Sequence, residues 1–199
     1  MVSLMKSKNS KLIARQVISL EIEALKLLKK SLNKNFDKAV NTIVNCQSKI
    51  IFCGVGKSGL IASKIASTMS SVGCPAFSLS ANDCLHGDLG SISTKDLLII
   101  ISNSGKSKEL LPFIKFANRN KIKLIGIVSE KNSSLYKGSD IQILLPEVKE
   151  AGLGIVPTSS TSIQLAIGDA LAISALNKKK FSKYDFSKLH PGGNLGRQL

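Results

Sequence analysis

The chain has 199 residues, 43% hydrophobic and 21% charged, which is typical of one globular domain. No apolar run approaches the ~20 residues of a membrane span, and the first twenty residues lack the apolar block of a secretion signal. The net charge of +15 is concentrated at the two ends of the chain and is almost all lysine, whereas proteins that read nucleic-acid grooves favour arginine. We therefore expect a cytoplasmic protein with neither a membrane nor a specific nucleic-acid partner.

The first part of the chain has helical spacing. Seven apolar side chains within residues 11–31 fall on one face of a predicted helix: Leu12, Ile13, Val17, Leu20, Ala24, Leu27 and Leu28. A second helix is predicted at 35–46. We expect residues 1–48 to form N-terminal helices that pack on a core or on an oligomer interface.

From residue 49 onward, short apolar runs alternate with amphipathic stretches. Helices are predicted at about 57–72, 107–119 and 160–177, and strands at "KIIFC", "PAFSL", "DLLIIIS", "KLIGIV" and "DIQILL". The middle strands are apolar throughout, as strands buried on both faces of a parallel sheet must be. The pattern predicts one α/β domain over 49–199, a three-layer αβα sandwich with a parallel sheet.

The first strand runs into "GVGKSG", residues 54–59, which resembles two nucleotide-binding motifs. A P-loop needs a glycine five residues before Gly56, and that position is Ile51. A dinucleotide site needs an acidic residue about 20 positions on, at the end of the second strand. That region reads "FSLSAND", with Asp83 too late, so neither nucleotide is favoured.

Two further strands lead into turns rich in hydroxyl groups. Residues 102–107, "SNSGKS", combine serines, a glycine and a helix N-terminus, a cradle that suits a phosphate monoester. The alternative is an ordinary turn with Ser107 as a helix cap. A third cluster, "PTSSTS" at 157–162, opens the last long helix. All three turns should face the carboxyl edge of one sheet, where ligands bind in such folds.

Six motifs occur in an order that is similar to one known family: "GVGKSG", "HGDLG", "ISNSG", "PTSST", "GDALA" and "HPGGNLGR". From about residue 45 to 199 the chain resembles the sugar isomerase (SIS) domain of bacterial D-arabinose-5-phosphate isomerases. The resemblance implies a five-stranded parallel sheet and interconversion of D-ribulose 5-phosphate with D-arabinose 5-phosphate, for the 3-deoxy-octulosonate sugar of lipopolysaccharide. It also implies a homo-oligomer, typically a tetramer, with active sites between protomers and no cofactor.

Aldose–ketose isomerisation proceeds through an enediol and needs a base and hydrogen-bond donors for the developing oxyanion, without requiring a metal. By the resemblance, His190 is the leading proton-transfer residue, reaching into a neighbouring protomer's site, and His86 contacts sugar hydroxyls. The resemblance adds Lys57, Glu109 and Glu150 to the catalytic set. The expected substrate and phosphate contacts are Gly56, Ser58, His86, Ser102, Asn103, Ser104, Ser107, Thr158, Ser159 and Ser160.

Each catalytic assignment has a simpler alternative. Lys57 can be a solvated lysine, Glu109 a capping residue, Glu150 an exposed loop carboxylate, and His190 the start of a turn that ends the domain. Cys84 and His86 alone do not make a metal site, so no metal is expected.

The chain departs from the family pattern in three ways. Lys106 stands where the family usually has an acidic residue, and the loop after Glu150 is apparently one residue shorter. Many members of the family continue into a tandem pair of CBS domains. No CBS domain is expected within the 199 residues, which are either an SIS-only form or a chain that stops at a domain boundary. Two alternatives stay open for function: isomerisation of another phosphosugar, or a non-catalytic phosphosugar-sensing module.

Overall fold

The computed structural model of the chain describes residues 9–192. Its centre is a five-stranded sheet with the strand order β2-β1-β3-β4-β5, in which every neighbouring pair is parallel. The strands are β1 (Ile50–Gly54), β2 (Ala76–Ser80), β3 (Leu97–Ser102), β4 (Lys123–Val128) and β5 (Ile141–Leu144). The chain proceeds in opposite directions from β1 and from β3, so the switch point of the sheet lies between these two strands.

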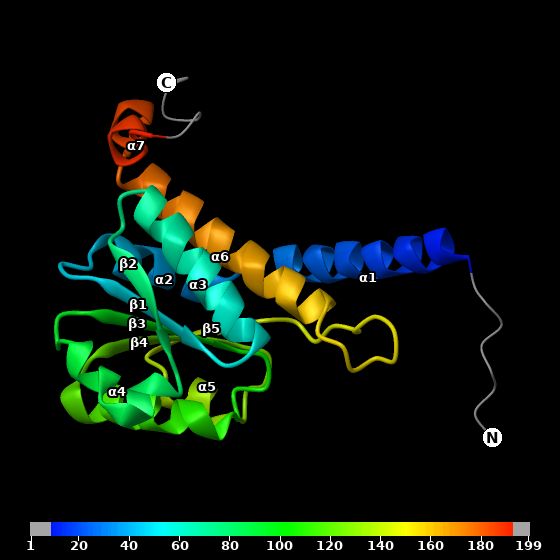
Figure 1. Cartoon of the computed structure of the whole chain (residues 1–199), viewed down its shortest axis with the longest axis horizontal. Coiled ribbons are helices and arrows are strands. Elements are labelled where there is room, and N and C mark those ends of the chain that lie inside the picture. Colours follow the sequence, from blue (N-terminus) through cyan, green and yellow to red (C-terminus); the bar gives the residue numbers. More distant parts are fainter. Residues whose placement is uncertain (1–8, 193–199) are drawn as a thin grey trace.

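Helices cover both faces of the sheet, which confirms the predicted three-layer sandwich (Figure 1). On one side lie α2 (Lys34–Val44), α3 (Lys57–Ser71) and α6 (Ser159–Lys178), and on the other lie α4 (Leu111–Asn120) and α5 (Ser134–Gly138). The remaining helices are α1 (Ser10–Ser31) and α7 (Lys183–Leu189), together with 3-10 turns η1 (Asp83–His86), η2 (Asp88–Ser91) and η3 (Lys108–Leu110).

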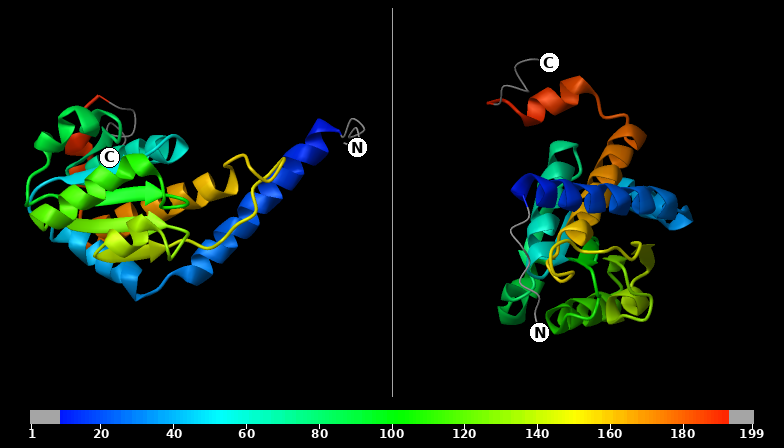
Figure 2. Two further views of the ribbon diagram at one scale, coloured as in Figure 1. Left: turned by 90° about the horizontal axis from the view of Figure 1, so that it is seen from below. Right: turned by 90° about the vertical axis from the view of Figure 1, so that its right-hand side faces the viewer.

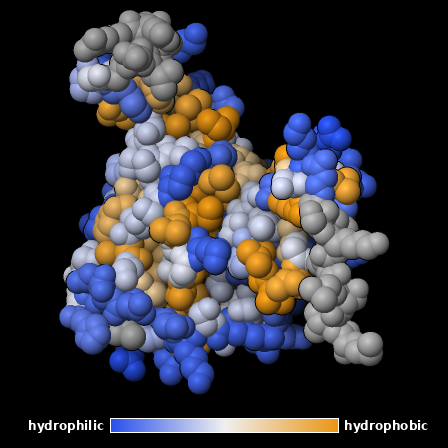
Figure 3. All heavy atoms as spheres, turned by 45° about the vertical axis from the view of Figure 1, so that its right-hand side comes forward, coloured by the Kyte–Doolittle hydropathy of each residue, from blue (hydrophilic) through white to orange (hydrophobic). Residues whose placement is uncertain are grey.

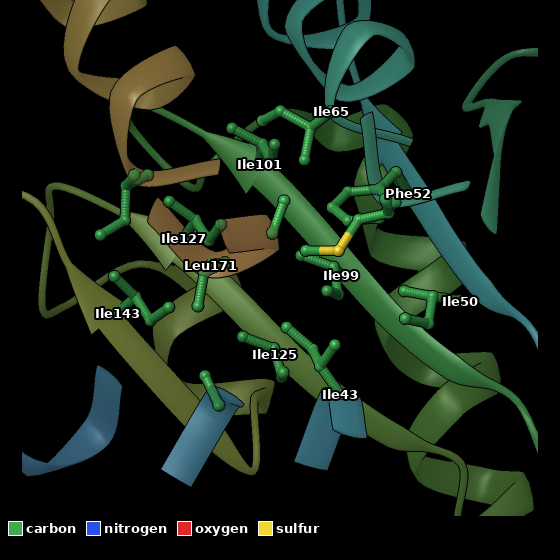
Figure 4. Packing of buried hydrophobic residues seen from close by; sticks show 14 of the residues in the cluster. Ile43, Ile50, Phe52, Ile65, Ile99, Ile101, Ile125, Ile127, Ile143 and Leu171 are labelled. Carbon is green, nitrogen blue, oxygen red and sulfur yellow. The ribbon is translucent and has the colours of Figure 1, made fainter. Parts of the chain in front are cut away.

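The strands divide their side chains between two cores. Successive side chains of a strand point to opposite faces, so in β3 Ile99 and Ile101 enter one core while Leu98 and Ile100 enter the other. Figure 4 shows the first core, where the isoleucines of β3, β4 and β5 lie beside Leu171 of α6. Every residue of β1 and β3 is buried, as the uninterrupted apolar runs predicted.

The first helix is only half attached to the domain. Ala24 and Leu28 are buried against the first core, but Leu12, Ile13 and Leu27 are each more than 40% exposed. Figures 1 and 2 show why: the N-terminal half of α1 projects beyond the sheet. The prediction of one apolar face holds for the spacing, yet three of its seven residues are exposed in the structure of residues 9–192. No helix among residues 9–192 is long and apolar enough to cross a membrane.

A buried carboxylate connects β1 and β3 at the edge of the sheet where these strands begin. Asp96, which precedes β3, accepts hydrogen bonds from the Ser48 hydroxyl at 2.6 Å, the Lys49 ammonium at 2.8 Å and the Ser93 amide at 2.7 Å. Asp96 is 3% exposed. Burial alone would raise its pKa, but these hydrogen bonds outweigh burial and hold the pKa at about 2.

Candidate active site

The turn after β1 is shaped by its glycines. A Cβ on Gly54 would lie 2.7 Å from the carbonyl carbon of Ser58, so only glycine allows the strand end to approach the first turn of α3 this closely. Gly56 has a φ of 58°, in the region that favours glycine. The helix consequently begins at Lys57, whose exposed ammonium makes no ion pair within residues 9–192.

The turn after β3 is partly closed on itself. The Gly105 amide donates to Ser102 Oγ at 3.0 Å, and the Lys106 amide donates to Ser104 Oγ at 3.3 Å. The amides of Ser104 and Ser107 donate to no acceptor in the described part of the protein. The turn therefore keeps free N–H donors at its mouth, as a site for an anion requires.

Contacts with the next loop hold this second turn in place. Ser129, directly after β4, donates its hydroxyl to Asn103 Oδ1 at 2.8 Å and its amide to the Asn103 carbonyl at 3.0 Å. Lys106, which departs from the family pattern, forms an ion pair with Glu130. Sequence reasoning missed Ser129 and Glu130, although their position just after an apolar strand was a usable signal.

Glu150 is not a free loop carboxylate. Its Oε2 accepts from the Thr158 amide at 2.8 Å, the Thr158 hydroxyl at 3.1 Å and the Ser160 amide at 3.3 Å. It therefore caps the N-terminus of α6, where backbone N–H groups are otherwise unsatisfied. Thr158 and Ser160 thus already have a partner here, and their predicted contact with substrate stays a prediction.

These contacts set the charge of Glu150. Partial burial raises the pKa of the carboxyl, but hydrogen bonds from Ser160 and Thr158 outweigh it and place the pKa below the usual value. Glu150 is therefore a carboxylate at neutral pH.

A polar bridge joins the first turn of α3 to the second turn of α6. The Ser58 hydroxyl donates to Oε1 of Gln164 at 3.0 Å, across 106 positions of sequence. Because β1 and β3 are paired neighbours, the turns after them also lie side by side. The structure thus gathers at one edge the predicted groups at 56–58, 102–109 and 150–160.

The two histidines lie in different parts of the molecule. His86 ends η1, after β2, and is exposed. His190 follows α7, beyond the far end of α6, a helix of 20 residues and therefore about 30 Å long. Its Nδ1 lies 2.8 Å from the Phe186 carbonyl, and its ring stacks on Phe186. Because a carbonyl only accepts, Nδ1 carries the hydrogen and a neutral ring presents Nε2 as the acceptor.

Within residues 9–192, no group of three or more His, Cys, Asp or Glu side chains is placed to hold a metal ion. The site as described consists of hydroxyls, amides, ammonium groups and carboxylates. Such groups can bind a small anion and move protons beside it.

Comparison with known proteins places the chain in a family. Residues 43–174 match the SIS domain. The chain belongs to the SIS domain family. Two curated relatives are named arabinose 5-phosphate isomerase KdsD. The one from Yersinia pestis is 42% identical over 93% of this chain and 57% of its own length. The one from Francisella tularensis is 43% identical over 94% of this chain and 58% of its own length. The chain thus spans less than three fifths of the length of these two relatives.

One solved structure matches nearly the whole chain. A protein of E. coli CFT073, determined in complex with arabinose 5-phosphate, superposes with a TM-score of 0.88 and 35% identity over 92% of this chain and 100% of its own. The resemblance inferred from the six motifs is therefore confirmed at the level of family and fold.

Proposed function

We propose that this chain is a D-arabinose-5-phosphate isomerase, which interconverts D-arabinose 5-phosphate and D-ribulose 5-phosphate. The observation that carries the proposal is that the turn before Lys57 and the 102–107 turn follow the paired strands β1 and β3 at the switch point of the sheet, in a chain of this family. The names of the two curated relatives and the arabinose 5-phosphate bound to the E. coli protein support the substrate class. The product would supply 3-deoxy-octulosonate synthesis.

In this proposal the 102–107 turn binds the phosphate. The open amides of Ser104 and Ser107 donate to phosphate oxygens, and the hydroxyls of Ser102 and Ser107 line the cradle. Asn103 is already held by Ser129, so it fixes the shape of the turn while its remaining groups face outward. Gly56 and Ser58 form the opposite wall, with Thr158, Ser159 and Ser160 at the start of α6.

The chemistry balances with protein groups alone. A base removes the proton from C2 of the aldose, O1 gains a proton, and the product is the enediol. The hydroxyl on C2 then loses its proton while C1 gains one, which yields the ketose. We assign the carbon proton transfer to Nε2 of His190 and stabilisation of the developing oxyanion to Lys57. Glu109 and Oε1 of Glu150 are assigned the transfers between oxygens.

The proposal needs a second copy of the chain. His190 lies beyond the far end of α6 from Lys57 of its own chain, so the imidazole that acts at a site must come from another protomer. The exposed apolar face of α1 and the neighbouring Leu153 and Ile155, 81% and 75% exposed, supply a surface for such an assembly (Figure 3). A groove of about 710 Å³ separates α1 from this loop. We propose a homo-oligomer, with a tetramer and a cytoplasmic location as predictions.

Isotope exchange tests the activity. The chain is incubated with D-ribulose 5-phosphate in deuterated water, and the arabinose product is quantified and examined for deuterium at C2, which enters whenever the proton on the base exchanges with solvent before it is returned. No exchange and no product would refute the proposal. Binding of the sugar phosphate, seen as a rise in Tm with neither product nor exchange, would instead favour the phosphosugar sensor.

A further inference from the structure

Gln164 is a buried polar residue that neither the proposed chemistry nor the family motifs use. It lies on α6 and is 1% exposed. Its Oε1 accepts the Ser58 hydroxyl, but its Nε2 is buried without any partner in the described residues. Rotating the amide would exchange the two atoms and leave the oxygen unpaired instead, because Ser58 offers only one hydroxyl.

This arrangement is poor for stability. A buried amide with half of its hydrogen-bonding capacity unused costs free energy, whereas an apolar side chain of similar size would fill the same space without that cost. Apolar residues of α6 surround it, with Ile163, Ile167 and Leu171 fully or almost fully buried. Gln164 is therefore better explained by what it positions than by what it stabilises.

The position of Gln164 connects the two ends of the candidate site. Ser58 is the second residue of α3 and adjoins Lys57. On α6, Gln164 lies one turn after Ser160, so the two side chains share a helix face, and Ser160 contacts Glu150. Two polar contacts one helical turn apart thus connect α6 to the two ends of the site: Ser160 is held by Glu150, and Gln164 holds the residue beside Lys57.

We propose that Gln164 is a positioning residue for the isomerase site: by holding Ser58 it fixes the first turn of α3 and hence the place of Lys57 relative to Glu150. This inference rests on the proposed function. Gln164 itself does not touch substrate. Its loss should misplace the lysine without disturbing the phosphate cradle at 102–107.

The test is Gln164→Met, which keeps the volume and removes both polar atoms. We expect kcat to fall roughly ten- to hundred-fold, as small misplacements of a catalytic group do, with KM unchanged because the phosphate turn is intact. Tm should stay equal or rise, because the unpaired buried donor is gone. A purely structural residue would give the opposite pattern, a lower Tm with kcat unchanged.

Two further variants sharpen the result. Ser58→Ala should lower kcat by a similar factor, and the double variant should lose no more than either single one, because both remove the same bridge. The matched control is Lys64→Met, which breaks the other polar bridge between α3 and α6, the exposed ion pair with Asp169, and should leave kcat unchanged.

The outcomes separate the two proposals. If the unmodified chain shows no isomerisation, the proposed function falls and this inference falls with it. If the unmodified chain is active and Gln164→Met retains its kcat, or loses kcat only in step with Tm, this inference alone is overturned.

Discussion

Gly105 shows how closely a single residue can be specified by its surroundings. Its φ is 64°, in the region that favours glycine, and a Cβ at this position would lie 2.6 Å from Val128 Cγ2 and also overlap Ser133. The same residue donates its amide to Ser102 and accepts the amide of Leu135. The turn after β3 is therefore anchored at Gly105 to the start of α5.

We predict that Gly105→Ala destabilises the protein by about 2–4 kcal/mol, the sum of backbone strain and overlap in a packed region. Urea unfolding measures the change. Gly152→Ala is the matched control, because Gly152 has a φ of 67° but open space where its Cβ would go. It should cost only the strain, about 1–2 kcal/mol. Equal losses in the two variants would contradict the proposed overlap.

At the scale of elements, the amino ends of β1 and β3 are joined through Asp96. The carboxylate is satisfied by donors from residues 48, 49 and 93, which flank the two strands. Because its pKa is about 2 when folded and 3.8 ordinarily, the ionised form favours the folded state. This contribution is present above pH 3.8 and is lost as the pH falls towards 2.

We therefore predict that Asp96→Asn costs about 2 kcal/mol of unfolding free energy at pH 7, and that the difference from wild type narrows as the pH is lowered from about 4 to about 2. Denaturant unfolding at several pH values measures both effects. Asp140→Asn, at an exposed position near the starts of β4 and β5, is the control and should have a smaller effect. A gap that is constant with pH would count against the assigned ion pair.

The long elements were predictable because their patterns are local. The helices predicted at 11–31, 35–46, 57–72 and 160–177 correspond to α1, α2, α3 and α6 within two residues at each end. The helix predicted from 107 begins instead as the 3-10 turn η3, with α4 following from Leu111 and Pro112 in its first turn. The short helices α5 and α7 escaped prediction, because five to seven residues carry too little periodicity.

The candidate site was predictable only where glycines and hydroxyls follow strands. The turns at 54–59 and 102–107 were recognised on that basis. Gln164 was not, because a glutamine inside an apolar helix gives no signal until the neighbouring helix is in place. The capping role of Glu150 depends on the fold of an irregular loop, which no local pattern specifies.

At the scale of the whole molecule, the separation of Lys57 from His190 can be tested by mixing two inactive variants. Lys57→Met and His190→Asn should each be inactive alone, losing roughly 100- to 10,000-fold in kcat. Mixed under conditions that exchange subunits, they should regain activity, because about a quarter of two-protomer sites then combine an intact lysine with an intact histidine.

The recovered activity should depend on subunit exchange. Each variant mixed with itself is the control, and the assay compares the activity before and after exchange. If the mixture stays inactive while both variants assemble normally, His190 does not serve a neighbouring site.

The length of α6 has a consequence of its own. Glu150 caps the first turn of this helix, and its last turn leads to the segment that carries His190. Each residue inserted into the helix would advance that segment by about 1.5 Å and rotate it by about 100° around the helix axis. One added residue would thus swing the imidazole to another side of the molecule, whereas four would nearly restore its direction. The helix acts as a spacer whose tolerated lengths should come in whole turns.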